Sequence, residues 1–460
     1  MNTFFKFCIL LIAFLAVQSS LKAQDTLRYS LSEFIEAGLE NSSLINAQKR
    51  EIELAQNRVF RAQSQRILPR VNLNTAHGLI PGVTSPSGTP SNQLYLDPNL
   101  ENDWENWAVF TQAEITALQP IYTWGAIGNA VKAAREGAEA VIHQVEAEKN
   151  AYKLQLAELY YSRLLSVELH RLISQAQRDL VDAEKQLEEM RDSGDHNLEE
   201  ADFFQFYIFT HEFAAQADEV YQNLIFSNEV WKLALGITGD VVLLPNENFL
   251  DPLPQPINAV TFYEQSALEN RPELKGLASA QRAARAGKEA IEAGYYPSLF
   301  LGLQARGAYT PNRPRQTNPF IRNTTNYGSV SFGFSFQQNL NVVQIRNQAQ
   351  RSQIQIRQLE DFEYAAQDGI MLEIRDQYRA LMIAESRMRN IRKAFDVSNE
   401  WLRMEQIDYD LGFADAKNLV DALRNKFEFE ANYLNRVHDY NTRKIRLWNS
   451  TGLPIQNLTQ

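Results

Sequence analysis

Residues 329–336 read Ser-Val-Ser-Phe-Gly-Phe-Ser-Phe, with valine or phenylalanine at every second position. This alternation predicts a β-strand that has one apolar face and one face of small or polar side chains. Residues 338–412 follow almost directly and contain no proline, which predicts a helix of roughly 110 Å at about 1.5 Å per residue. A short amphipathic strand that leads into so long a helix is unusual in compact domains, whose helices average only a few turns.

Three further stretches predict strands of the same kind: residues 71–75 after Pro69, residues 107–117, and residues 299–309 after Pro297. Their apolar positions are Val71, Leu73, Thr75, Trp107, Val109, Ala113, Ile115, Ala117, Leu299, Leu301, Leu303, Ala305 and Tyr309. Strands of about ten residues with this period are typical of membrane β-barrels. A half-buried sheet of a soluble protein gives the same alternation, but the long helices that flank each strand pair favour the barrel.

The chain runs through this order of elements twice. Leu39-Glu40-Asn41 recurs as Leu268-Glu269-Asn270, and the spacing from Gln119 to Gly194 is identical to the spacing from Gln337 to Gly412. We therefore predict two repeats, residues 30–236 and 259–452, joined by a proline-rich connection over residues 237–258. This connection is expected to form a midway belt together with the C-terminal tail.

Within the first repeat, the pattern predicts single helices over residues 30–66 and 121–194. Between the two strands of that repeat, residues 81–106 are rich in Pro, Ser, Asn and Gly and predict a long polar loop. No segment beyond the first residues of the chain approaches the length of apolar run that a transmembrane helix needs, so none is expected.

Residues 1–23 are predicted to be a secretory signal peptide, because Lys6 precedes an unbroken apolar run over residues 7–17 and Ala23 ends a plausible cleavage site. Gln24 would then come first, so a lipid anchor on an N-terminal cysteine is not expected. Cleavage removes two lysines and no acid, which takes the formal net charge from −11 to −13, and it removes the single cysteine. An acidic, cysteine-free chain excludes disulfides and thiol catalysis and argues against a nucleic-acid partner.

Four strands are too few to close a barrel, because the smallest single-chain barrels have eight. Open strand edges are not tolerated in hydrocarbon either. Other copies of the chain are therefore expected to complete the wall. Three copies give twelve strands and an open lumen, whereas two copies give eight strands and a filled interior, so we favour a homotrimer. The predicted fold class is mainly α with a β-barrel part, in which each chain contributes four strands to a trimeric twelve-stranded transmembrane barrel.

Three short motifs carry a family resemblance. Residues 409–421 read Tyr-Asp-Leu-Gly-Phe-Ala-Asp-Ala-Lys-Asn-Leu-Val-Asp, Gln119-Pro120-Ile121-Tyr122 is followed by Gly125, and Asn270-Arg271-Pro272-Glu273-Leu274 opens a helix. Together with the duplication, these motifs resemble the TolC family of outer-membrane efflux channels across essentially the whole mature chain. The resemblance implies a trimer in the outer membrane of a Gram-negative bacterium, with long coiled-coil hairpins that form an α-helical tunnel into the periplasm.

The resemblance also implies partners and site residues. Channels of this family are passive exit ducts of tripartite efflux or type I secretion systems, and they work with an inner-membrane pump or secretion ATPase through a periplasmic adaptor. The adaptor's hairpin meets the channel tips, which here are the turns around Gly194 and around Gly412 and Phe413. Pro69, Pro120 and Pro297 correspond to strand–helix junctions, where the barrel in the outer-membrane lipid gives way to the tunnel.

In members of this family, acids six and nine residues after the tip glycine can surround the closed entrance. These positions are Asn418 and Asp421 here, so one acid is absent, and Glu200 is the corresponding acid of the first repeat. Three copies of Asp421 would favour cations and would raise one another's carboxylate pKa by repulsion. Asp421 and Glu200 fit equally well as solvated acids on a helix face. Tyr409 either bonds across the tip to lock the closed state or packs on an apolar face.

Three other classes of protein compete with a channel. An enzyme is disfavoured because the six histidines show no metal-ligand spacing and the sequence has no nucleophile elbow or phosphate loop, so no catalytic, cofactor-binding or metal-binding residue is predicted. A periplasmic adaptor would have one helical hairpin rather than two. A trimeric coiled-coil adhesin would carry its barrel strands at one end of the chain. The cargo stays open among drugs, metal ions, bile acids and secreted polypeptides.

Overall fold

The computed structural model describes residues 25–90, 93–192, 200–316, 318, 320–321, 323–411 and 416–458. The chain divides into two compact units. The first unit consists of residues 1–50, 143–275 and 364–460, and the second unit of residues 51–142 and 276–363. Each unit is therefore assembled from segments that lie far apart in the sequence.

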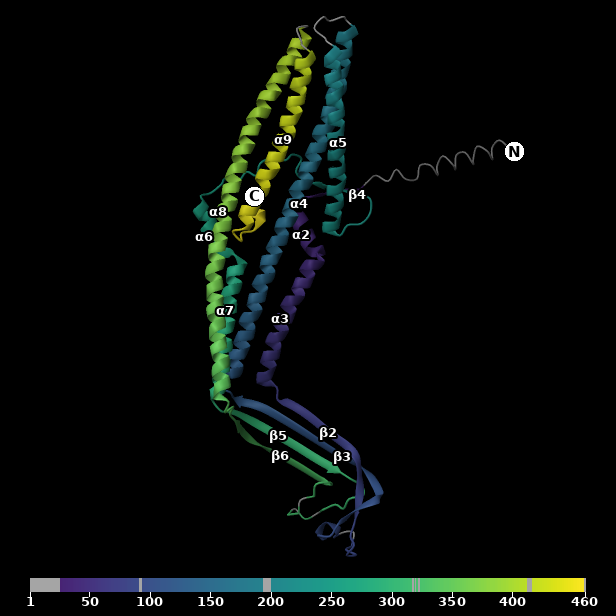
Figure 1. The fold of residues 1–460 in the computed structure, drawn as a ribbon, viewed down its shortest axis with the longest axis vertical. Coiled ribbons are helices and arrows are strands. Elements are labelled where there is room, and N and C mark those ends of the chain that lie inside the picture. Colours follow the sequence, from purple (N-terminus) through teal and green to yellow (C-terminus); the bar gives the residue numbers. More distant parts are fainter. Residues whose placement is uncertain are drawn as a thin grey trace, which may run out of the picture. The chain divides into compact units, whose positions relative to one another are not determined.

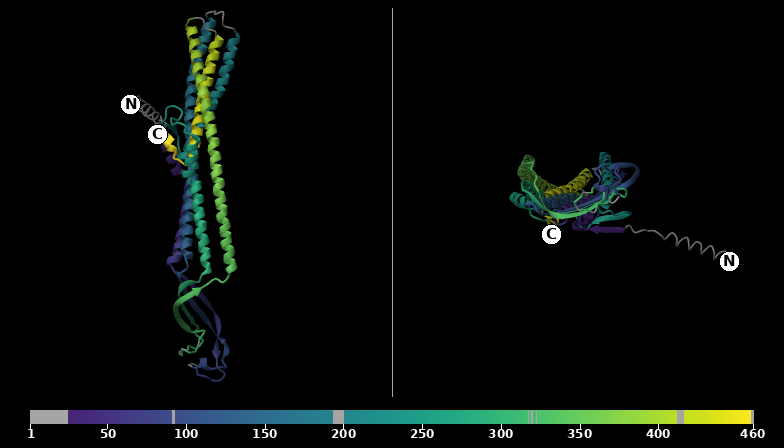
Figure 2. Two further views of the ribbon diagram at one scale, coloured as in Figure 1. Left: turned by 90° about the vertical axis from the view of Figure 1, so that its left-hand side faces the viewer. Right: turned by 90° about the horizontal axis from the view of Figure 1, so that it is seen from below.

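The second unit contains a four-stranded antiparallel sheet with the order β2-β3-β5-β6 (Figure 1, Figure 2). Its strands are β2 (Arg70–Thr84), β3 (Glu101–Tyr122), β5 (Ser298–Tyr309) and β6 (Tyr327–Gln337). All four strands expected from the alternating pattern are therefore present. β2 and β6 are the edge strands. β2 and β3, which follow one another in the sequence, are neighbours in the sheet, and so are β5 and β6.

The prediction of a polar loop over residues 81–106 is wrong at both ends of this stretch. β2 continues to Thr84 and β3 already begins at Glu101, and these two residues pair with each other after a register shift at Pro81. The ladder is built from backbone hydrogen bonds, which polar side chains do not prevent. A stretch that lacks the apolar alternation that marks a strand in the sequence can therefore still pair in a ladder.

The long helices expected from the proline-free stretches are confirmed. α4 (Ala126–Asp192) has 67 residues and α8 (Val342–Asp410) has 69 residues. α5 (Glu200–Leu235) follows α4, and α9 (Ala416–Asn449) follows α8. Within the described residues, none of the helices combines the length and the apolar character that a bilayer crossing requires.

The helix expected from residue 121 begins only at Ala126, because β3 extends to Tyr122. The backbone turns from strand to helix at Trp124 and Gly125, whose φ angles are 51° and 85°. Glycine adopts this left-handed conformation at no steric cost, whereas Trp124 adopts it at a cost of roughly 1–3 kcal/mol. The sequence shows the glycine, but the strained neighbour is visible only in the structure.

The single helix expected over residues 30–66 is two helices, α2 (Leu31–Asn41) and α3 (Ser43–Ile67). Ser42 between them has an extended backbone with ψ 114°, and its Oγ accepts a hydrogen bond from the N–H of Ile45 at 3.3 Å. Serine competes with helix geometry by such local bonds and favours a helix start. A similar break occurs later in the chain, where Arg271 separates α6 (Val260–Asn270) from α7 (Pro272–Glu292).

A short parallel strand pair in the first unit was not predicted at all. β1 (Asp25–Tyr29) pairs with β4 (Val241–Pro245), so the proline-rich connection begins as a strand. Single 3₁₀ turns complete the described structure: η1 (Leu94–Leu96), η2 (Ala293–Tyr295) and η3 (Ile455–Leu458).

The first unit has two apolar clusters. The belt cluster, defined here by its largest member Trp231 and its neighbours Phe34 and Tyr160, joins α2, α4, α5, α8, α9 and the connection. The tip cluster joins the ends of α4 and α8 to the starts of α5 and α9, and its members include Leu180, Phe206, Phe213, Leu402 and Leu423. Both clusters bring the two long hairpins of this unit together side by side (Figure 2).

Candidate channel wall and entrance

The strand register places the apolar positions of all four strands on one face of the sheet. Leu73 of β2 lies opposite Ile115 of β3, and Ile115 lies opposite Ala305 of β5, which lies opposite Val330 of β6. The next rows of the same face include the pair Leu303 and Phe332. Because side chains alternate strictly along a strand, this register gives a continuous apolar surface. It is open to the surroundings, with Phe332 84% exposed.

The opposite face of the sheet is mainly polar, although Ile80, Phe110, Leu118 and Phe300 also lie on it. Glu114 of β3 accepts a hydrogen bond from Nε2 of Gln304 of β5 at 2.5 Å, and Nε2 of Gln112 donates to the hydroxyl of Tyr327 at 3.4 Å. Ser329, Ser331, Gly333 and Ser335 of β6 lie on this side, since they alternate with the apolar positions. The sheet therefore has two faces of different polarity, a pattern typical of the strands of membrane barrels.

The three prolines expected at strand–helix junctions occupy different positions. Pro69 stands between α3 and β2, and Pro297 stands directly before β5. Pro120 lies inside β3, at a register shift where Ile121 is skipped by the pairing with β5. β2 pairs with β3 only as far as Leu118, so the missing N–H of Pro120 leaves no gap in that ladder. The indole Nε1 of Trp124 donates to the carbonyl of Pro297 at 2.9 Å and links two of these junctions.

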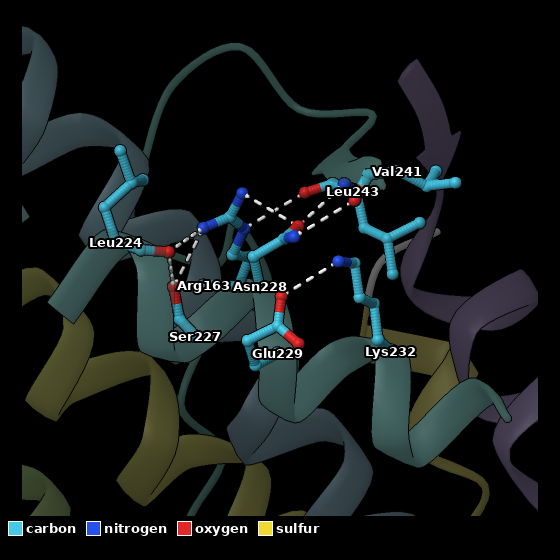
Figure 3. A network of polar contacts seen from close by, with 8 residues as sticks. All are labelled: Arg163, Leu224, Ser227, Asn228, Glu229, Lys232, Val241 and Leu243. Atoms are coloured by element: carbon cyan, nitrogen blue, oxygen red, sulfur yellow. Dashed lines mark hydrogen bonds and ion pairs between the residues drawn. The ribbon is translucent and has the colours of Figure 1, made fainter. Parts of the chain in front are cut away.

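A buried arginine holds the proline-rich connection to the hairpin of α4 and α5 (Figure 3). Arg163 of α4 donates from Nε to the carbonyl of Leu243 at 3.0 Å and from Nη1 to Ser227 Oγ at 2.9 Å. It also donates to the carbonyl of Leu224 and to the amide oxygen of Asn228, as Figure 3 shows. Burial lowers the pKa of Arg163 to about 10, and no described carboxylate forms an ion pair with it. The positive charge of Arg163 is therefore stabilised by hydrogen bonds to neutral acceptors.

Two asparagines clamp the connection in the same way. Asn228 of α5 donates to the carbonyl of Val241 at 3.1 Å and accepts from the N–H of Leu243 at 2.8 Å. Asn441 of α9 donates to the carbonyl of Asp251 at 2.9 Å and accepts from the N–H of Leu253 at 2.9 Å. Both asparagines precede a Thr-Gly pair at the same spacing in the sequence. Each hairpin thus binds one extended stretch of the belt through the same pair of hydrogen bonds.

Lys444 of α9 completes the second clamp. Its side chain is 3% exposed, and Nζ donates to the carbonyl of Leu253 at 2.8 Å, to the carbonyl of Gln255 and to the hydroxyl of Tyr440. Burial lowers the pKa of Lys444 from 10.5 to about 8, although the negative charge of Glu385 opposes this shift. Desolvation of the ammonium therefore outweighs the attraction of the nearest acid.

This shift predicts a pH dependence of stability. Between pH 8 and pH 10.5 the unfolded chain holds the Lys444 proton and the folded chain does not, so the contribution of this residue to stability rises with pH across that window. The gain is at most about 3 kcal/mol. Thermal unfolding of wild type and Lys444→Met, followed by circular dichroism on both sides of that window, measures it. Wild type should gain relative to Lys444→Met at the higher pH, and a constant difference contradicts the assignment.

At the tip of the first unit, the structure describes four of the predicted entrance residues. Tyr409 is half-buried and packs against the tip cluster. Asn418 and Glu200 are exposed. Gly194, Gly412 and Phe413, the residues expected to meet an adaptor, lie outside the described residues.

Asp421 is the fourth predicted entrance residue that the structure describes. It is half-exposed at the margin of the tip cluster, between the buried residues Val420 and Ala422. Its Oδ1 lies 3.9 Å from Nη1 of Arg424, one helical turn further along α9. The guanidinium of Arg424 in turn lies over the ring of Phe209 of α5, at 4.8 Å from the ring centroid. An aspartate in this setting keeps an accessible carboxylate whose charge is partly compensated by a cation of its own helix.

Sequence reasoning missed the belt clamps. A single arginine or lysine in a long helix is normally a solvated residue, and nothing in the local pattern distinguishes Arg163 or Lys444 from the others. The signal that was available is the shared spacing of Asn228 and Asn441 from a following Thr-Gly pair. Among the residues that the structure describes, no three His, Cys, Asp or Glu side chains come together as metal ligands would.

We compared the sequence and the structure of the chain with those of known proteins. No protein-family model and no curated protein matches the sequence. Solved structures do match. The channel CusC has 14% identical residues over 95% of this chain and 95% of its own, with a TM-score of 0.71. The outer-membrane channel MtrE of Neisseria gonorrhoeae, in its open state, has 16% identity over 94% of this chain and 90% of its own, with a TM-score of 0.70. The outer-membrane protein VceC of Vibrio cholerae has 14% identity over 92% and 96%, with a TM-score of 0.63.

These structures cover nearly the whole of the chain and nearly the whole of their own length. The resemblance to TolC-type outer-membrane channels is thereby confirmed at the level of the fold: a mostly helical chain with a small antiparallel sheet.

Proposed function

We propose that three copies of this chain form a passive channel through the outer membrane. The observation that carries the proposal is the sheet with one continuous apolar face, one polar face and two edge strands that each have a single neighbour among the described strands. In lipid, an open edge leaves backbone groups without hydrogen-bond partners at a cost of several kcal/mol each. The edges therefore need partners, and the four strands of one chain are too few to supply them by curling up.

The order of the strands supports closure by identical copies. β2 and β6 run antiparallel to each other in the alternation of the sheet, so β6 of one copy can pair with β2 of the next without interrupting it. Such a head-to-tail contact generates a ring when the rotation closes. Three copies give a barrel of twelve strands, with Ser329, Ser331 and their neighbours facing the water and the apolar face in contact with outer-membrane lipid.

The long hairpins of the first unit are proposed to build the tunnel that continues this lumen into the periplasm. A periplasmic adaptor and an inner-membrane pump or secretion ATPase would deliver cargo to the tips around Gly194 and Gly412, after export directed by the signal peptide at residues 1–23. Together they would form a tripartite efflux or type I secretion system. The structural similarity to CusC and MtrE, which are channels, supports this role.

Electrical measurements test the channel and its entrance together. Wild-type protein in planar bilayers should give discrete conductance steps, and protein that gives none contradicts the channel. Asp421→Ala should raise the single-channel conductance and shift permeability from cations towards anions. The shift is expected because removal of the carboxylate leaves Arg424 without its nearby counter-charge.

Asp396→Ala is the matched control for the entrance. Asp396 forms the same kind of exposed helical pair, with Arg392 at 3.1 Å, but it belongs to α8 and lies several turns before the end of that helix at Asp410. This variant should leave conductance and selectivity unchanged. If Asp421→Ala behaves like Asp396→Ala, then Asp421 is a solvated acid and does not line the entrance.

A further inference from the structure

The helix ends that adjoin the strands carry far more basic than acidic residues. Residues 58–67 of α3, 126–135 of α4, 283–292 of α7 and 342–351 of α8 contain nine Lys or Arg and two Glu, a net charge of +7. The whole chain has a net charge of −11. All four segments, which we call the basic collar, belong to the second unit, as the sheet does. A charge of opposite sign gathered beside the strands points to a partner at this level.

Most cations of the collar are not neutralised by other described residues of the chain. Arg285 pairs with Glu360 at 2.9 Å, and Lys288 pairs with Glu292 at 3.5 Å. The other seven basic residues are exposed, and no carboxylate of the described chain lies within ion-pair distance of them. Arg61 and Arg66 lie in the last two turns of α3, and Arg346 lies in the first two turns of α8. Their charges are therefore available to an external anion.

Aromatic side chains lie between the collar and the strands. Trp124 stacks on Tyr296 at 4.9 Å, and Tyr122 meets Trp124 edge-on at 5.1 Å. All three are exposed, although Trp124 occupies the strained left-handed conformation with φ 51°. Exposed Trp and Tyr beside an apolar strand surface are typical of the level where hydrocarbon gives way to lipid headgroups. Strain retained at such a position indicates that the placement of the indole matters.

We propose that the basic collar binds the phosphate headgroups of anionic phospholipids in the leaflet on the helix side of the sheet. This inference rests on the proposed insertion of the sheet into the membrane. Each segment of the collar extends over roughly 15 Å of helix from its end beside the strands, so it crosses a headgroup layer that is roughly 5–8 Å deep. Basic residues at that level attract anionic lipid and act over about a Debye length.

An acidic protein is a less fitting partner for this surface. The collar is distributed over four helix ends rather than gathered on one face, and exposed apolar side chains, Leu340 and Val343, stand among its charges at the start of α8. A lipid offers both components, since its phosphate can pair with Arg346 while its glycerol and acyl chain contact the apolar residues.

Fluorescence quenching tests the proposal on the full mature chain. The protein is reconstituted into phosphatidylcholine bilayers that contain brominated phosphatidylglycerol, and separately into bilayers with brominated phosphatidylcholine. Quenching of tryptophan gives the relative binding constant of the two lipids, and Trp124→Phe identifies the part of the signal that comes from the collar. Wild type should prefer the anionic lipid by roughly fivefold, and the preference should fall at about 1 M salt.

Arg61→Gln/Arg66→Gln/Arg346→Gln should bring the preference close to one. The matched control, Arg387→Gln/Lys393→Gln/Arg403→Gln, removes three exposed positive charges from the part of α8 that belongs to the first unit and should leave the preference unchanged. Equal effects of the two variants, or no preference in wild type, overturn the proposal.

Loss of the preference on addition of inorganic phosphate at millimolar concentration would assign the collar to free phosphate instead. Protein that neither inserts nor conducts fails the proposed function itself, whereas protein that conducts without lipid preference fails only this inference.

Discussion

Trp231→Ala is expected to lower the free energy of unfolding of the first unit by about 3–5 kcal/mol. Trp231 of α5 is fully buried, and its ring lies 4.2 Å from that of Phe34 of α2 and 5.2 Å from that of Tyr160 of α4. Its Nε1 also donates to the carbonyl of Leu159 at 3.0 Å. Deletion of the indole removes the contacts that three helices share and leaves a cavity that the surrounding rigid helices cannot fill.

The loss of stability extends to the belt, because Tyr160 contacts both Trp231 and the strand β1. The hydroxyl of Tyr160 donates to the carbonyl of Tyr29 in β1 at 2.9 Å, so the ring that Trp231 supports also holds the parallel strand pair. Hydrogen exchange measured by mass spectrometry should show faster exchange in β1 and β4 of Trp231→Ala. A chemical unfolding curve followed by circular dichroism gives the overall change.

Trp104→Ala is the control for this experiment. It makes the same chemical deletion at a tryptophan that is 65% exposed, and it should change the unfolding midpoint little. If both variants are destabilised equally, the packing around Trp231 does not contribute to the free energy of unfolding as expected.

Phe332→Arg is expected to prevent insertion of the sheet into a bilayer. Phe332 lies in the middle of β6 on the apolar face, opposite Leu303 of β5. An arginine on the lipid face near the bilayer midplane costs about 2–4 kcal/mol in each chain. The fraction of protein that becomes resistant to protease in liposomes, measured over a urea series, should fall accordingly.

Ser331→Arg separates this effect from a general intolerance of β6 to arginine. Ser331 is the neighbouring residue of the same strand, but it pairs with Gln304 on the polar face. An arginine there would contact water in the lumen, so insertion should be close to that of wild type and only conduction should change. If Ser331→Arg blocks insertion and Phe332→Arg does not, the two faces of the sheet have been assigned the wrong way round.

The strands could be predicted because their chemistry is periodic. The alternation of Val330, Phe332 and Phe334 with small residues survives in the structure as one face, and the register extends that face across all four strands. The polar ends of β2 and β3 could not be predicted in this way, since a ladder held by backbone bonds leaves no periodic trace in polar side chains. The long helices were legible for a similar reason: proline is absent from the whole length of α4 and of α8, which is a strong signal.

The sequence predicts a belt in the proline-rich connection but not the contacts that hold it, because the segments that form these contacts are short and far apart in the chain. β1, the first strand that the structure describes, pairs with β4 in the proline-rich connection, and each strand is too short to show a pattern. Arg163 and Lys444 are buried only because segments of the connection fold over them and supply carbonyl groups. Such environments depend on tertiary contacts that a local sequence pattern does not encode.

The candidate entrance was predicted in part. The resemblance directed attention to Asp421 and Tyr409, and the structure adds that Arg424 stands beside the first and that the second packs on the tip cluster. Their roles in gating, and the repeats, the homotrimer and the partners, stay predictions. The belt clamps at Asn228 and Asn441 came only from the structure, although they have the same spacing from a Thr-Gly pair in the sequence.

The number of chains in the purified particle tests the central claim most directly. The mass of the mature protein in detergent, measured by light scattering with correction for bound detergent, should correspond to three copies, because each copy supplies the edge strand that its neighbour lacks. A particle of a single chain, stable and fully folded at low concentration, would contradict the account.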